Sequence, residues 1–198
     1  LQTCDEPGLA GKPVLPQEII ATEEGVKVRV DVTADPRLIG EADRVIFPGV
    51  GEASSAMAYL RTKGLDGTIR SLTQPVLGIC LGMQLLGRTS AENNTDCLGI
   101  MPYAVHRFDS SDVKVPHVGW NNISGLRSSL FDGIAESEYM YFVHSYFVET
   151  GPESIAETEH GVPFSAAVAS RNFYAVQFHP ERSGAAGSQI LENFLNLR

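Results

Sequence analysis

Apolar and polar positions divide most of the chain into short strands and helices. Alternating valines over residues 26–32 give the period-two pattern of a strand with one buried face. Apolar runs predict further strands over residues 44–47, 76–79, 98–103, 105–108, 139–148, 155–159, 164–169 and 173–178. Helical spacing predicts helices over residues 16–24, 53–63, 66–72, 82–89 and 190–195.

The order of these elements predicts the fold class. Strands alternate with helices in the first half, which indicates a parallel sheet, and the second half is richer in strands. We therefore expect an α/β fold with a mixed, mainly parallel central sheet and added antiparallel hairpins. No linker divides the 198 residues, so we expect a single domain over 1–198. Residues 1–16 contain three prolines and predict no strand.

Composition and charge exclude several classes of protein. With 15 basic and 24 acidic residues the formal charge is −9, which argues against a nucleic-acid partner. The longest apolar stretch, residues 76–86, falls short of the roughly 20 residues that span a bilayer, so we expect no membrane association. No signal peptide is visible at the start. The three cysteines lack a CxxC spacing, which favours a reducing, cytoplasmic setting and predicts no structural metal.

A Gly-x-Cys-x-Gly segment, residues 78–82, carries the sharpest chemical signal. It joins a predicted strand to a predicted helix, and its glycines remove the Cβ clashes that would close such a turn. A thiol at Cys80 would lie near a helix N-terminus, which favours its thiolate form, and the Leu81 amide would point to where an oxyanion develops. The alternative is that Cys80 is a small buried hydrophobe, as most free cysteines are.

A second signal follows the predicted strand 173–178. His179 and Glu181 are spaced so that an imidazole could take a thiol proton while a carboxylate orients the ring. A lone His-Pro-Glu is more often a surface turn, and four other histidines are available. Both candidate loops, however, follow sheet strands, and the carboxyl edge of an open α/β sheet is where such sites form.

A third strand-ending loop, residues 48–51, has the sequence Pro-Gly-Val-Gly. Two glycines let the backbone approach a ligand closely, and one amide here could be a second oxyanion donor. Taken alone this signal is weak, because Pro-Gly turns are common.

Together these segments resemble the class I, triad-type glutamine amidotransferases. The chain is most similar to the glutaminase subunits of imidazole glycerol phosphate synthases, which act in histidine biosynthesis. The resemblance covers the chain from about residue 25 to the C-terminus and rests on motifs at residues 48–51, 75–86, 116–121, 141–146 and 177–183. It implies the three-layer, flavodoxin-like fold of that family.

The resemblance also implies roles for individual residues. Cys80 would be the nucleophile that attacks glutamine, His179 the general base and acid, and Glu181 its orienting partner. Leu81 and Val50 would provide the oxyanion amides. Residues that match the glutamine pocket are Gly49, Gly51, Gln84, His144, Ser145 and Tyr146. From spacing alone, Gln84 could equally be a solvent-facing residue of its helix.

The family pairs its glutaminase with a cyclase subunit that receives the ammonia. Motifs for phosphate, metal or nicotinamide binding are absent from the sequence, so we expect no cofactor. The resemblance places Trp120, Asn121 and Arg182 toward that partner, and implies low activity until the partner binds its own ligand. A lone tryptophan is otherwise usually a core residue. The strand around residues 139–148 has few polar positions, for which burial on both faces is the simple explanation.

Two departures from the family pattern leave alternatives open. Residues 1–16 lack the usual first strand and Gly-Asn turn, and Arg182 stands where the family commonly has lysine. The alternatives are another thiol amidase or amidotransferase with the same elbow, and a non-catalytic subunit that keeps the fold.

Overall fold

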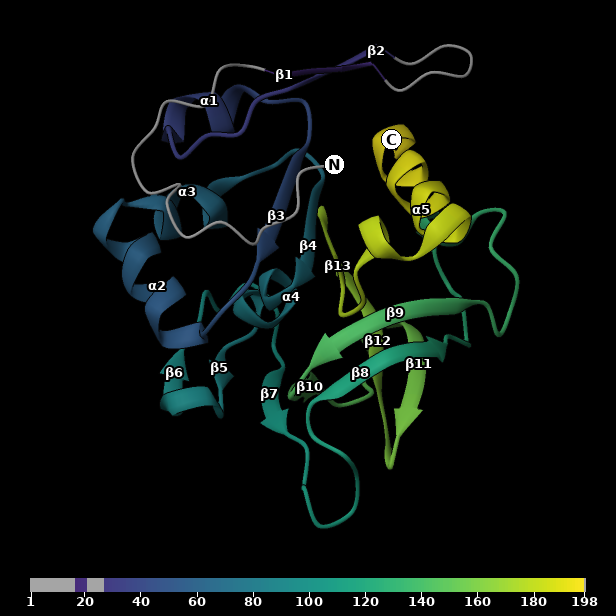
Figure 1. Ribbon diagram of the computed structural model, residues 1–198. Helices are drawn as coiled ribbons and strands as arrows, with labels where there is room; N and C mark the ends of the chain where they lie inside the picture. The colour runs from purple at the N-terminus through teal and green to yellow at the C-terminus, as the bar shows by residue number, and fades with distance from the viewer. Residues whose placement is uncertain (1–16, 21–26, 198) are drawn as a thin grey trace.

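A five-stranded mixed sheet lies at the centre of the protein, in the order β11-β12-β13-β4-β3 (Figure 1). The computed structural model describes residues 17–20 and 27–197. The strands are β3 (Val45–Gly49), β4 (Val76–Cys80), β11 (Ser154–His160), β12 (Val162–Ser170) and β13 (Phe173–Val176). β4 pairs in parallel with β3 and β13, whereas β12 pairs antiparallel with β11 and β13. The expected α/β fold with a mixed sheet is confirmed. Of the four strand pairings in this sheet, two are parallel and two antiparallel, so the sheet is not mainly parallel.

Layers of side chains cover both faces of this sheet. On one face lie the helices α2 (Ala53–Thr62), α3 (Leu65–Ser71) and α4 (Leu81–Leu86). On the other lie α5 (Gly184–Asn196) and a two-stranded ribbon, β8 (His117–Asn122) and β9 (Tyr139–His144). The strand period of two separates the two cores, so that Val76 packs with the first layer while Leu77 and Ile79 pack with the second. The three-layer arrangement expected from the family is confirmed.

The apolar run over residues 139–148 forms two strands instead of the single strand expected. β9 pairs with β8, whereas β10 (Tyr146–Val148) joins a second sheet with β7 (Ala104–Arg107), β5 (Thr89–Ser90) and β6 (Thr95–Asp96). The chain changes partner at Ser145. Burial on both faces is also wrong for β9, because Met140, Phe142 and His144 are buried while the alternate positions are partly or fully exposed.

Two further sequence-based expectations are wrong within the described residues. The helix expected over 16–24 is instead a strand at β1 (Gln17–Ile20), paired antiparallel with β2 (Lys27–Val30). The strand expected over 98–103 is an irregular segment whose amides bond to the end of α4, including Leu98 to Leu85 and Met101 to Leu86. Its apolar side chains are buried beneath that helix rather than on a sheet.

The remaining elements are short. They are α1 (Pro36–Glu41), η1 (Glu92–Asn94), η2 (Ser129–Phe131) and η3 (Pro180–Arg182). The expected departure at residues 1–16 lies outside the described residues. Within the described part of the chain, no helix is both long and apolar enough to cross a bilayer.

Candidate active site

Three strand-ending loops meet at the carboxyl edge of the parallel part of the sheet. β4 ends at Cys80, and the parallel register places Gly49 of β3 directly beside it. On the other side β13 pairs Val176 with Ile79 and leads to His179 two residues beyond Gln177. The convergence expected from the sequence is therefore present in the fold.

Cys80 sits on a strained turn between β4 and α4. Its backbone has φ 54° and ψ −110°, in the left-handed half of conformational space that non-glycine residues rarely adopt. Gly82 makes the turn possible, because a Cβ there would lie 1.9 Å from the carbonyl oxygen of Phe47. The tight packing of α4 on β3 fixes the cysteine at the top of the sheet.

His179 connects the sulfur to a carboxylate. Its Nδ1 lies 2.8 Å from Oε1 of Glu181, and the Cys80 side chain lies beside the ring. With Nδ1 engaged by the carboxylate, Nε2 is the ring nitrogen left for the sulfur. Contact with Cys80, and next the bond to Glu181, raises the pKa of His179 to about 9. Burial alone would raise the pKa of Glu181, but the bond from His179 helps to bring it below its usual value.

Strand β9 holds both loops in place. The thiol of Cys80 contacts the carbonyl oxygen of Val143 at 3.8 Å. The backbone amide of His179 donates to the carbonyl of Tyr141 at 2.9 Å. Ser183 accepts from the Tyr141 amide and donates to the His179 carbonyl. The thiol and the imidazole therefore share one rigid support.

The two expected oxyanion amides belong to the segments that adjoin Cys80. Leu81 provides the first amide of α4, which has no partner within the helix. Val50 follows the Gly49–Cys80 pair along β3, with a side chain that is 71% exposed. Gly49 allows the close approach of the two segments, since a Cβ there would lie 2.9 Å from the Gly82 nitrogen. Gly51 has φ 97°, which suits glycine.

The expected pocket residues differ in where their side chains lie. Gln84 is buried, not solvent-facing, and its Nε2 donates to the carbonyl of Tyr146 and to Oε1 of Gln177. The side chain of His144 is also buried and lies 2.9 Å from His117. Burial lowers the pKa of His144 to about 3, so its ring is neutral. Ser145 and Tyr146 form the partly buried turn from β9 into β10.

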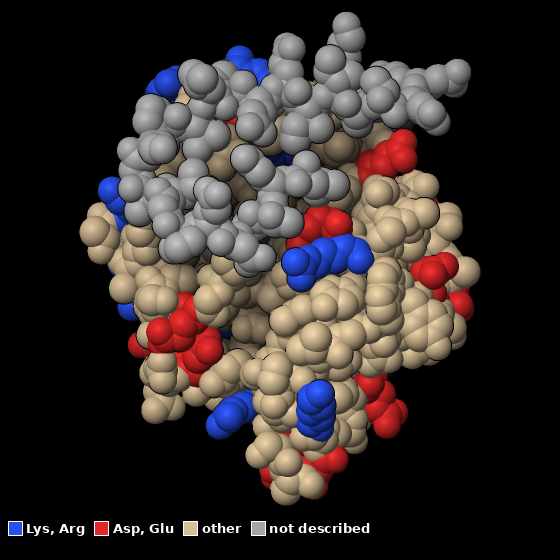
Figure 2. Space-filling model, viewed as in Figure 1, with Lys and Arg blue, Asp and Glu red and all other residues tan. Residues whose placement is uncertain are grey.

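Two of the expected partner residues, Trp120 and Arg182, lie at the outer face of the β8–β9 ribbon, whereas Asn121 turns to the inner face with His117. Trp120 is 55% exposed and so is not a core residue, and it packs edge-on against Tyr141 at 5.9 Å. The Arg182 guanidinium lies over the same tyrosine ring. Asn121 bonds to the Glu159 carbonyl at 2.8 Å. Figure 2 shows that the surface over β8 and β9 is largely uncharged.

Three groups at the site received no role from the sequence. They are the Val143 carbonyl, the side chain of Gln177 and the hydroxyl of Ser183. Gln177 and Ser183 lie within a motif that contains the histidine, which was the available signal. Every residue has a backbone carbonyl, so residue types could not single out that of Val143.

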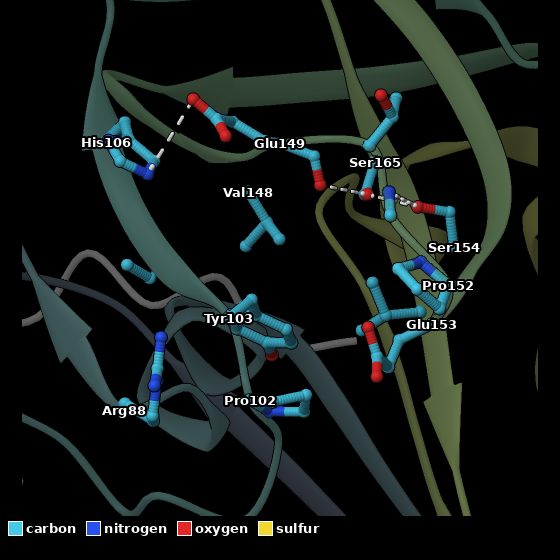
Figure 3. Close-up of a pocket in the computed structure, with 14 residues that line it drawn as sticks. Arg88, Pro102, Tyr103, His106, Val148, Glu149, Pro152, Glu153, Ser154 and Ser165 are labelled. Atoms are coloured by element: carbon cyan, nitrogen blue, oxygen red, sulfur yellow. Dashed lines mark hydrogen bonds and ion pairs between the residues drawn. The ribbon is translucent and has the colours of Figure 1, made fainter.

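A separate cavity of about 400 Å³ lies away from this site (Figure 3). Its lining includes Arg88, His106 and Glu149 but no member of the Cys-His-Glu group. Its buried serines, Ser154 and Ser165, already bond to each other. Within the described ranges no three His, Cys, Asp or Glu residues are arranged to hold a metal ion.

Comparisons with known proteins agree with this geometry. The model of the family "Glutamine amidotransferase class-I" matches residues 18–197. The imidazole glycerol phosphate synthase subunit HisH of Bacteroides fragilis is 54% identical over 172 residues, which is 86% of this chain and 88% of that protein. The HisH subunit of Escherichia coli strain K12 is 50% identical over 170 residues, 84% of this chain and 86% of its own.

Solved structures support the same fold. A crystal structure of a glutamine amidotransferase superposes with a TM-score of 0.64 at 17% identity, covering 84% of this chain and 87% of that one. A glutamine amidotransferase from Thermotoga maritima gives a TM-score of 0.53 at 17% identity, covering 79% of this chain and 64% of that one. The chain therefore belongs to the glutamine amidotransferase class-I family and, within it, to the HisH subunits of imidazole glycerol phosphate synthase.

Proposed function

We propose that this chain hydrolyses L-glutamine to glutamate and ammonia through a thioester on Cys80, and passes the ammonia to a cyclase subunit. The observation that carries the proposal is the grouping of Cys80, His179 and Glu181 at the carboxyl edge of the sheet, with the imidazole beside the thiol and bonded to the carboxylate. A thiol with an oriented imidazole beside it is suited to acyl transfer.

In the first step the proton of the Cys80 thiol already lies on His179, and the sulfur attacks the side-chain amide carbon of glutamine. The negative charge that develops on the amide oxygen is stabilised by the Leu81 and Val50 amides. The carbon–nitrogen bond then breaks, and His179 returns the proton to the leaving nitrogen as ammonia forms. A pKa of about 9 keeps the imidazole protonated near neutral pH, ready for this donation.

In the second step a water molecule attacks the γ-glutamyl thioester. His179 accepts a proton from the water, and the thiol leaves with a proton as glutamate forms. Two easier steps replace one direct attack of water on an amide. Glu181 keeps the ring in the orientation that both steps require.

The expected pocket residues contribute in different ways. Gln84 has both donors of its amide group engaged, so we assign its Oε1, which has no partner among the described residues, to the amide of the substrate. Gly49 and Gly51 admit the substrate close to the backbone. We assign the turn of His144, Ser145 and Tyr146 to the wall of the pocket, through its backbone and the two outer side chains.

Labelling with an electrophilic glutamine analogue, followed by mass spectrometry, tests the nucleophile. We expect one adduct, on Cys80. Burial raises the pKa of the Cys97 thiol to about 11, so Cys97 stays protonated and unmodified. Absence of any adduct, also with the ligand-loaded cyclase present, would favour a non-catalytic subunit instead.

We further propose that the β8–β9 ribbon binds the cyclase. Its uncharged outer face, with Trp120 and the neighbouring Arg182, has the aromatic and arginine character of interface hot spots. The side chain of Asn121 lies on the opposite face of β8, so we assign it no contact with the partner. The same ribbon would then carry the docking face and, on β9, the backbone groups that support Cys80 and His179. We propose that the chain forms one glutaminase domain. We place the complex in the cytoplasm, because a thiol nucleophile needs a reducing compartment.

Replacement of Trp120 by alanine tests this surface. Loss of an exposed aromatic anchor should weaken cyclase binding by about 30-fold or more, the range of an interface hot spot. Stimulation of glutamine hydrolysis by the ligand-loaded cyclase should fall with it, as measured by titration. Tyr59→Ala on α2, an aromatic residue of similar exposure, is the control and should bind normally. Equal binding by both variants would place the cyclase elsewhere.

A further inference from the structure

Behind the reacting sulfur lies Gln177, a fully buried glutamine with no role in the mechanism given above. It follows β13, and its backbone amide is bonded to the carbonyl of Ala166. Its side-chain Nε2 lies 3.8 Å from Cys80 Sγ. A buried amide of this kind must find partners for both ends, since an unpaired polar group in a protein interior is costly.

The Tyr146 carbonyl determines which end of that amide faces the sulfur. A carbonyl only accepts, so the Gln84 group 3.1 Å from it must be the NH₂. The same NH₂ lies 3.0 Å from the Gln177 side chain, which must therefore present its oxygen to Gln84. The NH₂ of Gln177 is thus left to donate to Cys80 Sγ.

The same carbonyl orients a second chain of side chains. His144 donates from Nδ1 to Tyr146 at 2.8 Å, so its Nε2 is an acceptor for Nδ1 of His117 at 2.9 Å. The remaining nitrogen of His117 then accepts from Asn121 at 3.5 Å. Burial, with His160 nearby, lowers the pKa of His117 to about 4, so both imidazoles are neutral as this direction of bonding requires.

These contacts give the sulfur an asymmetric environment. The Val143 carbonyl can accept the proton of the thiol, whereas the Gln177 amide and the His179 ring can donate to the thiolate. A hydrogen bond donated to an anion is stronger than one donated to a neutral group. Both donors therefore bond more strongly to the sulfur once its proton has gone to His179, and they hold it on one side of the turn.

We propose that Gln177 is a further catalytic residue, whose side-chain N–H stabilises the Cys80 thiolate and fixes its direction of attack. The buried chain through Gln84 and the Tyr146 carbonyl keeps that N–H pointed at the sulfur. The proposal deepens the proposed function, since it rests on Cys80 as the nucleophile. It assigns chemistry to a residue that does not touch glutamine.

The test measures the rate at which iodoacetamide alkylates Cys80 at fixed neutral pH, together with glutamine turnover in the cyclase complex. Gln177→Met keeps the length of the side chain but removes the donor. Loss of a hydrogen bond to a charged group predicts a fall of about 10- to 100-fold in both the alkylation rate and kcat, with KM nearly unchanged. Gln189→Met on α5, whose amide bonds to Asn193, is the matched control and should behave as the native chain.

The direction of the alkylation change separates catalysis from packing. A purely structural loss would loosen the site, expose the buried sulfur and speed its alkylation. Unchanged or faster alkylation in Gln177→Met would therefore overturn the proposal.

A second variant covers the case in which Gln177→Met does not fold. Gln177→Glu keeps the shape and can still accept from Gln84, but turns an oxygen toward the sulfur, so we expect alkylation to slow still further. A native rate in this variant would also overturn the proposal. If Cys80→Ala retained full turnover, the proposed function itself would fail, which is a distinguishable result.

Discussion

Cys80→Ser should lower kcat for glutamine hydrolysis by about 10⁴-fold or more, even with the ligand-loaded cyclase bound. Removal of a nucleophile from a group of residues that act as a unit typically abolishes nearly all of their joint contribution. The hydroxyl is far less acidic than the thiol and is a poorer nucleophile beside the same imidazole. Ammonia release in a coupled assay gives the measurement.

The fold should survive this substitution. Cys80 is almost fully buried, and serine is nearly isosteric and occupies the same turn, so thermal unfolding should shift only slightly. Cys97→Ala is the matched control, because Cys97 is equally buried but packs beneath α4 and η1, away from the site. It should lose some stability and keep its turnover. Turnover by Cys80→Ser within tenfold of the native value would contradict a thioester mechanism.

Local signals in the sequence identified the parts of the fold that position the site. The buried run over 76–80 and its glycines predicted the strand, the turn and the helix of the cysteine loop, and all three are present. The short helix α1 also had a visible signal, since Asp35 caps it and Pro36 occupies its first turn, although no helix was predicted there. Such features depend on neighbouring residues only.

The errors arose where the outcome depends on distant partners. The apolar run over 98–103 has the composition of a buried strand, but its amides bond to the end of α4 rather than to a strand. The break at Ser145 is invisible locally, because apolar residues continue on both sides while the partner changes from β8 to β7. The intrinsic strand propensity of these residues does not indicate which strand each segment pairs with.

The same distinction applies to the site. The residues that resemble the family triad could be named from motifs, and they meet as expected. The direction of the Gln177 amide could not, because it follows from the Tyr146 carbonyl, which lies 31 positions away in the chain and reaches Gln177 only through Gln84. Orientation within a buried polar network is set by the folded structure as a whole.

The largest effect on pH dependence should come from Glu181→Gln. The Glu181 bond is the second cause, after Cys80, of the raised pKa of His179. In the native chain His179 stays protonated until the pH passes about 9, and above that pH the acid for the leaving ammonia is lost. The stabilising contribution of the charged ring follows the same course: it is complete below about pH 6.5 and lost as the pH rises through about 9.

Without the carboxylate the pKa of His179 should fall, though not to its ordinary value, because the contact with Cys80 remains. The alkaline limb of kcat/KM should therefore move to lower pH, and kcat should fall by about 10²- to 10⁴-fold as the ring loses its orientation. Full pH–rate profiles of both proteins in the cyclase complex provide the measurement. Glu41→Gln, which breaks an exposed ion pair with Arg37, should leave the profile unchanged. An alkaline limb that stays in place in Glu181→Gln would show that another group, and not His179, supplies the proton, because the imidazole is bonded to this carboxylate and its pKa must respond to the loss.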